Sequence, residues 1–354
     1  MPTLLNMRLA TTPITYARRC IFGMRLDIVL RGGLVIDGTG APPFRGDVGI
    51  SGGSIAAIGD LSGVPAERVV DVRGMVVCPG FIDIHNHSDI SIFAVPTADN
   101  YVLQGVTTIV TGNCGLSPAP VTRENREFIR DSFRPYSAEI TIGWRGFGEY
   151  LERLEALDKG VNVAPLVGHG TVRAAVMGLS DQRPGEDEMR EMKRLVDEAM
   201  AAGAFGLSTG LVYVPGVFAA TEEVAELARV SAERGGIYAT HVRDEGEGLL
   251  DALAEAVAVA RSSGAPLQVS HLKASGRANW GRVSAALALL EDLASRGFDV
   301  SADAYPYTAG ATYLAALLPP WAREGGPREM ARRLRDPGVV ERLRRELAAP
   351  GTTW

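Results

Sequence analysis

Hydrophobic and polar residues follow two different patterns along the chain, and the change occurs near residue 80. Residues 25–79 alternate β-branched and polar residues, interrupted by glycine pairs. This pattern is typical of short strands joined by tight turns. We therefore expect a small β-domain over residues 25–79, built of hairpins and sandwich-like in character.

From residue 80, short apolar runs alternate with longer amphipathic segments. The runs predict seven strands, at residues 80–87, 106–115, 161–170, 204–210, 236–245, 266–273 and 298–307. The segments between them predict helices, including residues 186–203, 220–236 and 249–264, each ending in a glycine as helices often do. Strand–helix alternation implies a parallel sheet, so the pattern favours an α/β fold of the (β/α)8 TIM barrel type over residues 80–354.

The strand count falls one short of a closed barrel, which has eight strands. After residues 298–307 the sequence predicts a basic helix at residues 329–347, and the chain ends at Trp354. We therefore expect an incomplete barrel that lacks its last strand.

The composition is that of a globular protein, with 46% hydrophobic and 22% charged residues in 354. The net charge of −6 gives no reason to expect a nucleic acid or an anionic membrane as partner, and no apolar run reaches membrane-spanning length. Three scattered cysteines do not make a disulfide framework, so we expect a reducing cytoplasm. The oligomeric state stays open.

Residues 1–24 carry arginine and no acidic residue, which hints at a transit segment. They lack the apolar stretch of a signal peptide. We favour a disordered leader, because Met24 precedes a convincing strand and is a plausible start.

All five histidines fall at or near the C-terminal ends of predicted strands: His85, His87, His169, His241 and His271. In a barrel this is the rim where active sites are built. Side chains two apart in a strand point the same way, so the first two histidines can reach one point in space. Neutral imidazole is a common metal ligand, and the arrangement predicts a metal site.

Cys114 ends the second of these strands, in the motif TGNCG. A free cysteine is most often a small buried hydrophobic residue, but beside zinc it would be a thiolate ligand. His169, in VGHGTVR, is a candidate for contact with metal, with a ligand residue or with substrate.

Seven motifs together resemble the amidohydrolase superfamily, in its D-aminoacylase (N-acyl-D-amino-acid deacylase) branch. In chain order they are GFIDIHNHSD, GVTTIVTGNCG, VGHGTVR, GAFGLSTGLVYVPG, THVRDEGEG, VSHLKASG and DAYPYTAG. The resemblance covers residues 25–354.

The resemblance implies a zinc centre with one tight site and a second, weaker one. Cys114, His241 and His271 would hold the tight zinc, and His85 and His87 would bind at the other position. The cysteine would replace the carboxylated lysine of hydantoinase-like relatives. In agreement, the predicted fourth strand contains no lysine.

The resemblance also implies a pocket for a small N-acyl amino acid. Lys273, Tyr213 and Tyr305 match substrate-lining positions, and Lys273 is one of only three lysines, so we interpret it as a carboxylate partner. The alternatives are core packing for the tyrosines and a solvated charge for the lysine. Ala311 stands where the family has serine, which would weaken one substrate contact.

The family places a metal-binding aspartate, its general base, at the end of the eighth strand. We identify no counterpart, and so no catalytic acid or base in this sequence. We expect zinc-dependent hydrolysis of N-acyl-D-amino acids to a carboxylate and a free D-amino acid, impaired by C-terminal truncation.

Three alternatives stay open. N-acyl-D-glutamate and N-acyl-D-aspartate deacylases share these motifs. A dihydroorotase-like or hydantoinase-like enzyme would act on a cyclic amide. A zinc-binding remnant without catalytic activity, or a subunit that needs a partner chain, would retain the metal ligands alone.

Overall fold

The computed structural model describes residues 25–134 and 141–348. The chain divides into two compact units, with the boundary between Phe81 and Ile82. The leader expected at residues 1–24 lies outside the described residues.

The first unit is one mixed five-stranded sheet around its first strand. The strands are β1 (Leu26–Val35), β2 (Phe44–Ser51), β3 (Ser54–Gly59), β4 (Ala66–Asp71) and β5 (Val76–Val77). β1, β2 and β3 form the expected antiparallel hairpins. β4 and β5 run parallel to β1, because the chain crosses back before it adds β4 to the other edge of β1. This unit is therefore not built of hairpins alone.

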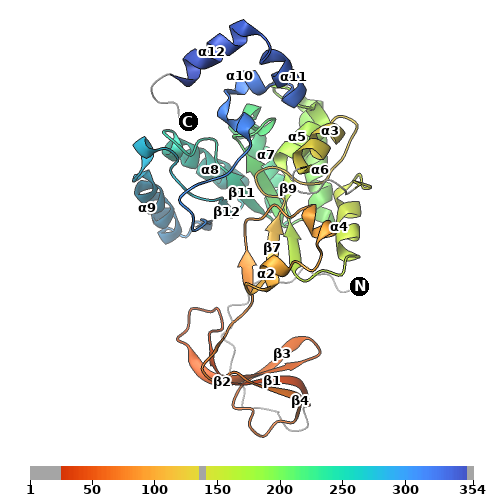
Figure 1. Ribbon diagram of the computed structural model, residues 1–354, viewed down its shortest axis with the longest axis vertical. Helices are drawn as coiled ribbons and strands as arrows, with labels where there is room; N and C mark the ends of the chain where they lie inside the picture. Colours follow the sequence, from red (N-terminus) through yellow and green to blue (C-terminus); the bar gives the residue numbers. More distant parts are fainter. Residues whose placement is uncertain (1–24, 135–140, 349–354) are drawn as a thin grey trace. The chain divides into compact units, whose positions relative to one another are not determined.

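The second unit contains a strand in each of the seven predicted segments (Figure 1). These strands are β6 (Phe81–Asp83), β7 (Val106–Thr111), β8 (Asn162–Pro165) with β9 (Val167–Gly168), β10 (Gly206–Gly210), β11 (Ile237–His241), β12 (Leu267–Val269) and β13 (Val300–Ala302). They form two sheets, β6-β7-β8 and β9-β10-β11-β12-β13, in chain order. β7 and β8 pair in parallel, and so do all neighbouring strands from β9 to β13, as strand–helix alternation requires. Closure into a barrel stays a prediction.

Helices fill the intervals between these strands. Before β10 they are α1 (Ser91–Ala94), α2 (Asp99–Val102), α3 (Arg126–Phe133), α4 (Phe147–Glu155), α5 (His169–Met177) and α6 (Glu186–Ala202). After β10 they are α7 (Thr221–Glu233), α8 (Leu249–Ser263), α9 (Arg282–Ser295), α10 (Pro320–Arg323), α11 (Gly326–Arg333) and α12 (Pro337–Leu347). Short 3-10 turns occupy Gly216–Phe218, Arg277–Asn279 and Leu314–Leu317.

The three predicted helices α6, α7 and α8 are confirmed, and their apolar stripes form the main core. Met192, Leu227 and Leu253 come from these three helices in turn, and each is fully buried. Residues spaced three or four apart share one face of a helix, so each stripe packs inward while the charged positions stay outside. Gly203 and Gly264 follow α6 and α8 at positive φ, the conformation that glycine adopts without strain.

The single basic helix predicted at residues 329–347 is wrong, because the structure has two helices there. α11 ends at Arg333, and α12 begins at Pro337. Proline cannot continue a helix from the preceding turn, whereas it fits the first position of a new one. The Asp336 side chain caps α12 by accepting hydrogen bonds from the backbone of Gly338 and Val339. No helix among the described residues is long and apolar enough to cross a membrane.

Candidate metal centre

The predicted ligands follow the carboxyl ends of strands in the second unit. His85 and His87 come just after β6, and Cys114 comes after β7. His241 is the last residue of β11, and His271 lies two residues beyond β12. The carboxyl ends of neighbouring parallel strands lie at one edge of a sheet, which is how residues far apart in the sequence come together here.

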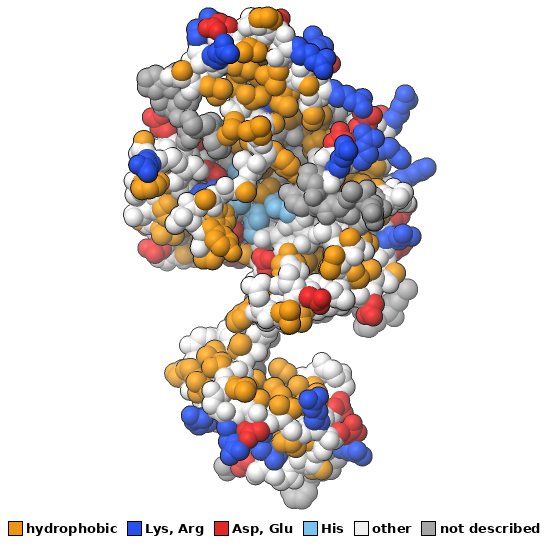
Figure 2. All heavy atoms as spheres, in the orientation of Figure 1, with side chains coloured by type: hydrophobic (Ala, Val, Ile, Leu, Met, Phe, Trp, Pro, Cys, Tyr) orange, Lys and Arg blue, Asp and Glu red, His pale blue; other side chains and the backbone are white. Residues whose placement is uncertain are grey.

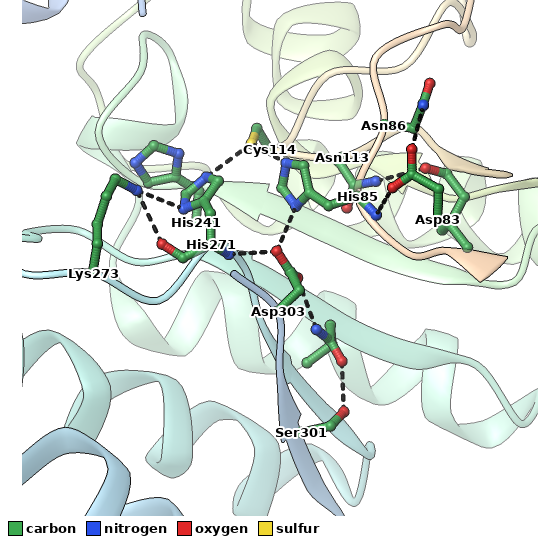
Figure 3. A network of polar contacts seen from close by, with 12 residues as sticks. Asp83, His85, Asn86, Asn113, Cys114, His241, His271, Lys273, Ser301 and Asp303 are labelled. Carbon is green, nitrogen blue, oxygen red and sulfur yellow. Dashed lines mark hydrogen bonds and ion pairs between the residues drawn. The ribbon is translucent and has the colours of Figure 1, made fainter. Parts of the chain in front are cut away.

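Three of these side chains meet at the Cys114 sulfur. Its Sγ lies 3.3 Å from Nε2 of His85 and 3.6 Å from Nε2 of His271 (Figure 3). One ligand atom from each of the three lies within 4.8 Å of the others, a spacing that one metal ion can bridge. A thiol with imidazoles is the donor set that zinc prefers, so these residues fit that metal.

His241 and His87 flank this group. The ring of His241 packs edge-on against His271, with centroids 4.3 Å apart, and the ring of His87 lies 5.4 Å from that of His85. Nδ1 of His241 is buried and has no hydrogen-bond partner in the described part of the chain. A buried imidazole nitrogen without a hydrogen-bond partner is a candidate metal ligand.

Burial keeps two of these imidazoles neutral, the form that binds metal. Burial, with the charges of His85 and His271, lowers the pKa of His87 to about 4. Burial also lowers the pKa of His241 to about 3, against the raising effect of the Glu245 carboxylate. Burial and then the Glu245 charge raise the pKa of the Cys114 thiol, so a metal would have to displace its proton.

The backbone is strained at two of the predicted ligand residues. Cys114 and His271 have φ of 54° and 36°, a region that residues other than glycine rarely occupy. The backbone of Cys114 is closely packed against Gly210. A Cβ placed on Gly210 would lie only 2.1 Å from the carbonyl oxygen of Cys114. Such strain persists where surrounding structure enforces it, and it is common at functional sites.

Glu245 is a member of this cluster that sequence reasoning missed. Its Oε1 lies 2.9 Å from Nδ1 of His271 and 3.7 Å from Nε2 of His241. Burial acts to raise the pKa of Glu245, but the hydrogen bond with His271 and nearby positive charges lower it to about 2. The available signal was its place in THVRDEGEG, four residues after His241.

Lys273 lies beside Glu245, with its Nζ 2.5 Å from Oε1 of that residue and 2.9 Å from Nδ1 of His271. From its position in the sequence, Lys273 was expected to pair with a substrate carboxylate. In the structure its carboxylate partner is a residue of the same chain.

Asp303 is a second acidic residue that sequence reasoning missed. Its Oδ1 accepts a hydrogen bond of 2.7 Å from the backbone N–H of His271 and lies 3.7 Å from Nδ1 of His85 (Figure 3). Gln268 donates to its other oxygen at 2.8 Å. Asp303 therefore holds the strained backbone of His271, and DAYPYTAG was the motif that contained it.

His169 lies in a different buried network. It begins α5, and its Nε2 is 2.9 Å from Oε1 of Glu223, which also accepts a 3.0 Å hydrogen bond from Arg173. Among the described residues, the groups of potential metal ligands are Cys114 with His85 and His271, and Glu245 with His241 and His271, so His169 is in neither. These contacts favour a structural connection between α5 and α7 at this position.

The two predicted tyrosines lie beside different members of the cluster. The ring of Tyr213 packs edge-on at 5.1 Å from that of His241, and its hydroxyl lies 2.8 Å from Oγ1 of Thr312. The ring of Tyr305 lies 5.5 Å from Nζ of Lys273.

A cavity of about 510 Å³ opens next to the cluster. His87, Cys114 and Tyr213 line it, with apolar side chains such as Leu116 and Phe128. Figure 2 shows histidine side chains in view in a hollow on the face of the second unit. The volume suits a small organic molecule.

Comparison with known proteins shows the family to which this chain belongs. A model of the amidohydrolase family matches residues 68–344. The chain belongs to the amidohydrolase family. The chain is 45% identical to the D-aminoacylase of Alcaligenes xylosoxydans xylosoxydans over 288 residues, which cover 81% of this chain and 59% of that protein.

Two further relatives extend the comparison within the amidohydrolase family. The N-acyl-D-glutamate deacylase of the same organism is 42% identical over 295 residues, 82% of this chain and 59% of that protein. A crystal structure of D-aminoacylase matches with a TM-score of 0.75 at 45% identity, over 80% of this chain and 59% of that one. The chain thus spans less than two thirds of the length of these relatives.

Metal is named for two further solved structures that the chain resembles. One D-aminoacylase structure addresses a binuclear metal centre, with activation by one metal and attenuation by a second. The N-acyl-D-glutamate deacylase of Bordetella bronchiseptica was solved with zinc and a phosphonate inhibitor.

Proposed function

We propose that this chain carries the zinc ligands and part of the substrate pocket of an N-acyl-D-amino-acid deacylase. The observation that carries the proposal is the meeting of Cys114, His85 and His271, whose ligand atoms lie within 4.8 Å of one another. The 45% identity to a D-aminoacylase supports the same reaction class, hydrolysis of a linear amide to a carboxylate and a free D-amino acid.

Cys114, His241 and His271 would hold a tightly bound zinc, and His85 and His87 a second, weaker metal. Bound zinc supplies Lewis-acid polarisation of the amide carbonyl and lowers the pKa of a bound water toward ~7. The Glu245 carboxylate accepts a hydrogen bond from Nδ1 of His271, which leaves Nε2 free to face the metal. Asp303 fixes the backbone that carries His271.

The remaining polar groups would orient the substrate. Tyr213 lines the cavity beside Cys114 and His87, and its hydroxyl would contact the substrate carbonyl. Lys273 contacts Glu245, and the ring of Tyr305 lies beside Lys273. Lys273 and Tyr305 remain our candidates for binding the substrate α-carboxylate. His169 stays a candidate for an indirect role in substrate binding. It packs against Gly216, which lines the cavity, since a Cβ placed on Gly216 would lie 3.8 Å from Nδ1 of His169.

Deacylases of acidic D-amino acids are the nearest alternative. An N-acyl-D-glutamate deacylase and an N-acyl-D-aspartate deacylase are 42% and 39% identical to the chain. A cyclic-amide substrate is less favoured, because β10 has no lysine to carboxylate.

The proposal includes four broader elements. Residues 25–79 would be the N-terminal part of a small β-domain, and residues 80–354 part of a (β/α)8 barrel. The protein would act in the cytoplasm on a small N-acyl amino acid.

Zinc content and stereospecific hydrolysis test this function together. We expect about one zinc per chain after purification, and hydrolysis of N-acetyl-D-methionine but not of the L isomer. The measurement would use this chain and a form extended with the C-terminal part of a D-aminoacylase.

Two outcomes are informative. Activity in the extended form alone would assign catalysis to the whole protein and zinc binding to this chain. Absence of zinc from both forms would overturn the proposal, because every role above depends on the cluster.

A further inference from the structure

The cavity beside the metal cluster contains one charged group that the proposed reaction does not use. Arg323, at the end of α10, lines this cavity and is only 7% exposed. One of its terminal nitrogens donates a 2.7 Å hydrogen bond to the carbonyl of Val212. Its Nε is buried and has no partner within the described part of the chain.

Arg323 also differs from the other charged residues around the cavity. Arg328 is exposed and pairs with Glu127 at 3.1 Å, and Asp131 pairs with Arg130 at the surface. No carboxylate among residues 25–134 and 141–348 lies within ion-pair distance of Arg323. Burial lowers the pKa of its guanidinium, and the charge of the nearby Tyr213 acts in the opposite direction.

An unpaired buried cation is costly, and proteins generally match such a charge with an anion. Arginine is suited to this role because its planar fork binds a carboxylate through two parallel hydrogen bonds. The surrounding wall is mostly apolar, with Leu179, Val214 and Met330, so a carboxylate there would meet little competition from water.

We propose that Arg323 forms an anion subsite that binds a second carboxylate of the substrate. This carboxylate would lie on the part of the molecule that extends from the metal cluster into the cavity. It belongs either to an acidic D-amino-acid side chain or to a dicarboxylic acyl group. The identity of the substrate rests on the proposed function, whereas the subsite rests on Arg323.

The α-carboxylate is the poorer occupant for this subsite. Lys273 and Tyr305, the candidates for that group, are not among the described residues that line the cavity, whereas His87 and Cys114 are. The cavity therefore extends from the metal cluster toward Arg323 without including Lys273.

Ligand binding to EDTA-treated protein tests the subsite without turnover. Isothermal titration would compare N-acetyl-D-glutamate, N-succinyl-D-methionine and N-acetyl-D-methionine, each with an α-carboxylate but only the first two with a second one. We expect at least one of the first two to bind about 10-fold to 100-fold more tightly than the third. Arg323→Met should abolish that ratio, and Arg323→Lys should retain part of it.

Arg328→Met is the matched control, because Arg328 lines the same cavity but is exposed and paired. It should leave the ratio within about twofold, since exposed ion pairs contribute little. Thermal unfolding of each variant would show that it is folded. A preference for glutamate assigns the subsite to the amino-acid side chain, and a preference for succinyl assigns it to the acyl group.

Equal binding of all three ligands to the wild-type protein would overturn the subsite, as would a ratio that survives in Arg323→Met. The proposed function is read separately, from hydrolysis by the zinc-loaded protein. A carboxylate preference without hydrolysis by this chain or by the extended form would retain the subsite and contradict the deacylase assignment. Hydrolysis without a preference for the ligands that have a second carboxylate would support the deacylase assignment and overturn the subsite.

Discussion

At the scale of residues, His271 connects the two sides of the cluster. Its Nε2 faces the Cys114 sulfur at 3.6 Å, and its Nδ1 faces Glu245 at 2.9 Å. A carboxylate on one imidazole nitrogen fixes the tautomer, so that the other nitrogen presents its lone pair. Glu245 is therefore expected to matter for metal affinity although it lies behind the ligand.

We predict that Glu245→Gln weakens zinc binding by about 10-fold to 100-fold, the usual effect of removing a carboxylate behind a ligand histidine. Competition with a chromophoric chelator measures this. Glu247→Gln is the control, because Glu247 is exposed in the same loop. Unchanged affinity in Glu245→Gln would mean that Glu245 does not orient His271.

Strand ends predicted the positions of His85, His87, Cys114, His241 and His271, which lie together at or after the ends of β6, β7, β11 and β12 in the structure. His169 lies in a different network, at the start of α5. Sequence reasoning missed Glu245 and Asp303, which depend on loop backbone that alternation does not describe. The positive φ of His271 turns the chain there, and the direction of nearby side chains could not be obtained from a strand pattern.

At the scale of elements, strands and helices were predicted where local signals agree. The glycines after α6 and α8 ended those helices as expected. The predicted strand at residues 266–273 is shorter in the structure, where β12 covers Leu267–Val269, because the following residues leave the ladder to place His271. The break between α11 and α12 was missed because the run of arginines was interpreted as one continuous helix. Pro337, which begins a new helix, was the signal for the break.

The Asp336 cap gives a prediction at this scale. Asp336→Ala should destabilise the first turn of α12 by about 1 kcal/mol. Amide exchange in Pro337–Leu347 should then become about fivefold faster, which mass spectrometry can follow. Glu341→Ala, which removes only an exposed pair with Arg344, should change exchange much less. Equal effects would show that the cap is not what holds the turn.

At the scale of the whole molecule, the ligands come from strands in both sheets of the second unit. Cys114 follows β7 in the three-stranded sheet, whereas His241 ends β11 and His271 follows β12 in the five-stranded sheet. A bound metal would cross-connect the two sheets. Strand order was predictable from the sequence because each strand follows the last, but the division into two sheets depends on the break between β8 and β9.

Zinc should therefore stabilise the folded chain. With free zinc at 100 times its Kd, linkage supplies about 2.7 kcal/mol, which corresponds to a rise in Tm of about 5 °C or more. Differential scanning calorimetry with zinc, with EDTA and with calcium as a control measures this. Cys114→Ser should reduce the zinc effect strongly, and an equal rise with calcium would count against a thiolate–imidazole site.

The spacing of the cluster along the chain has a consequence for synthesis. Cys114 lies 29 residues from His85 and 157 residues from His271. A nascent chain on the ribosome has the first two groups long before the third exists. The three donors can meet only after His271 has emerged from the exit tunnel, so the complete cluster belongs to a late stage of biogenesis. Until then the thiol of Cys114 must be kept reduced without the protection of that site.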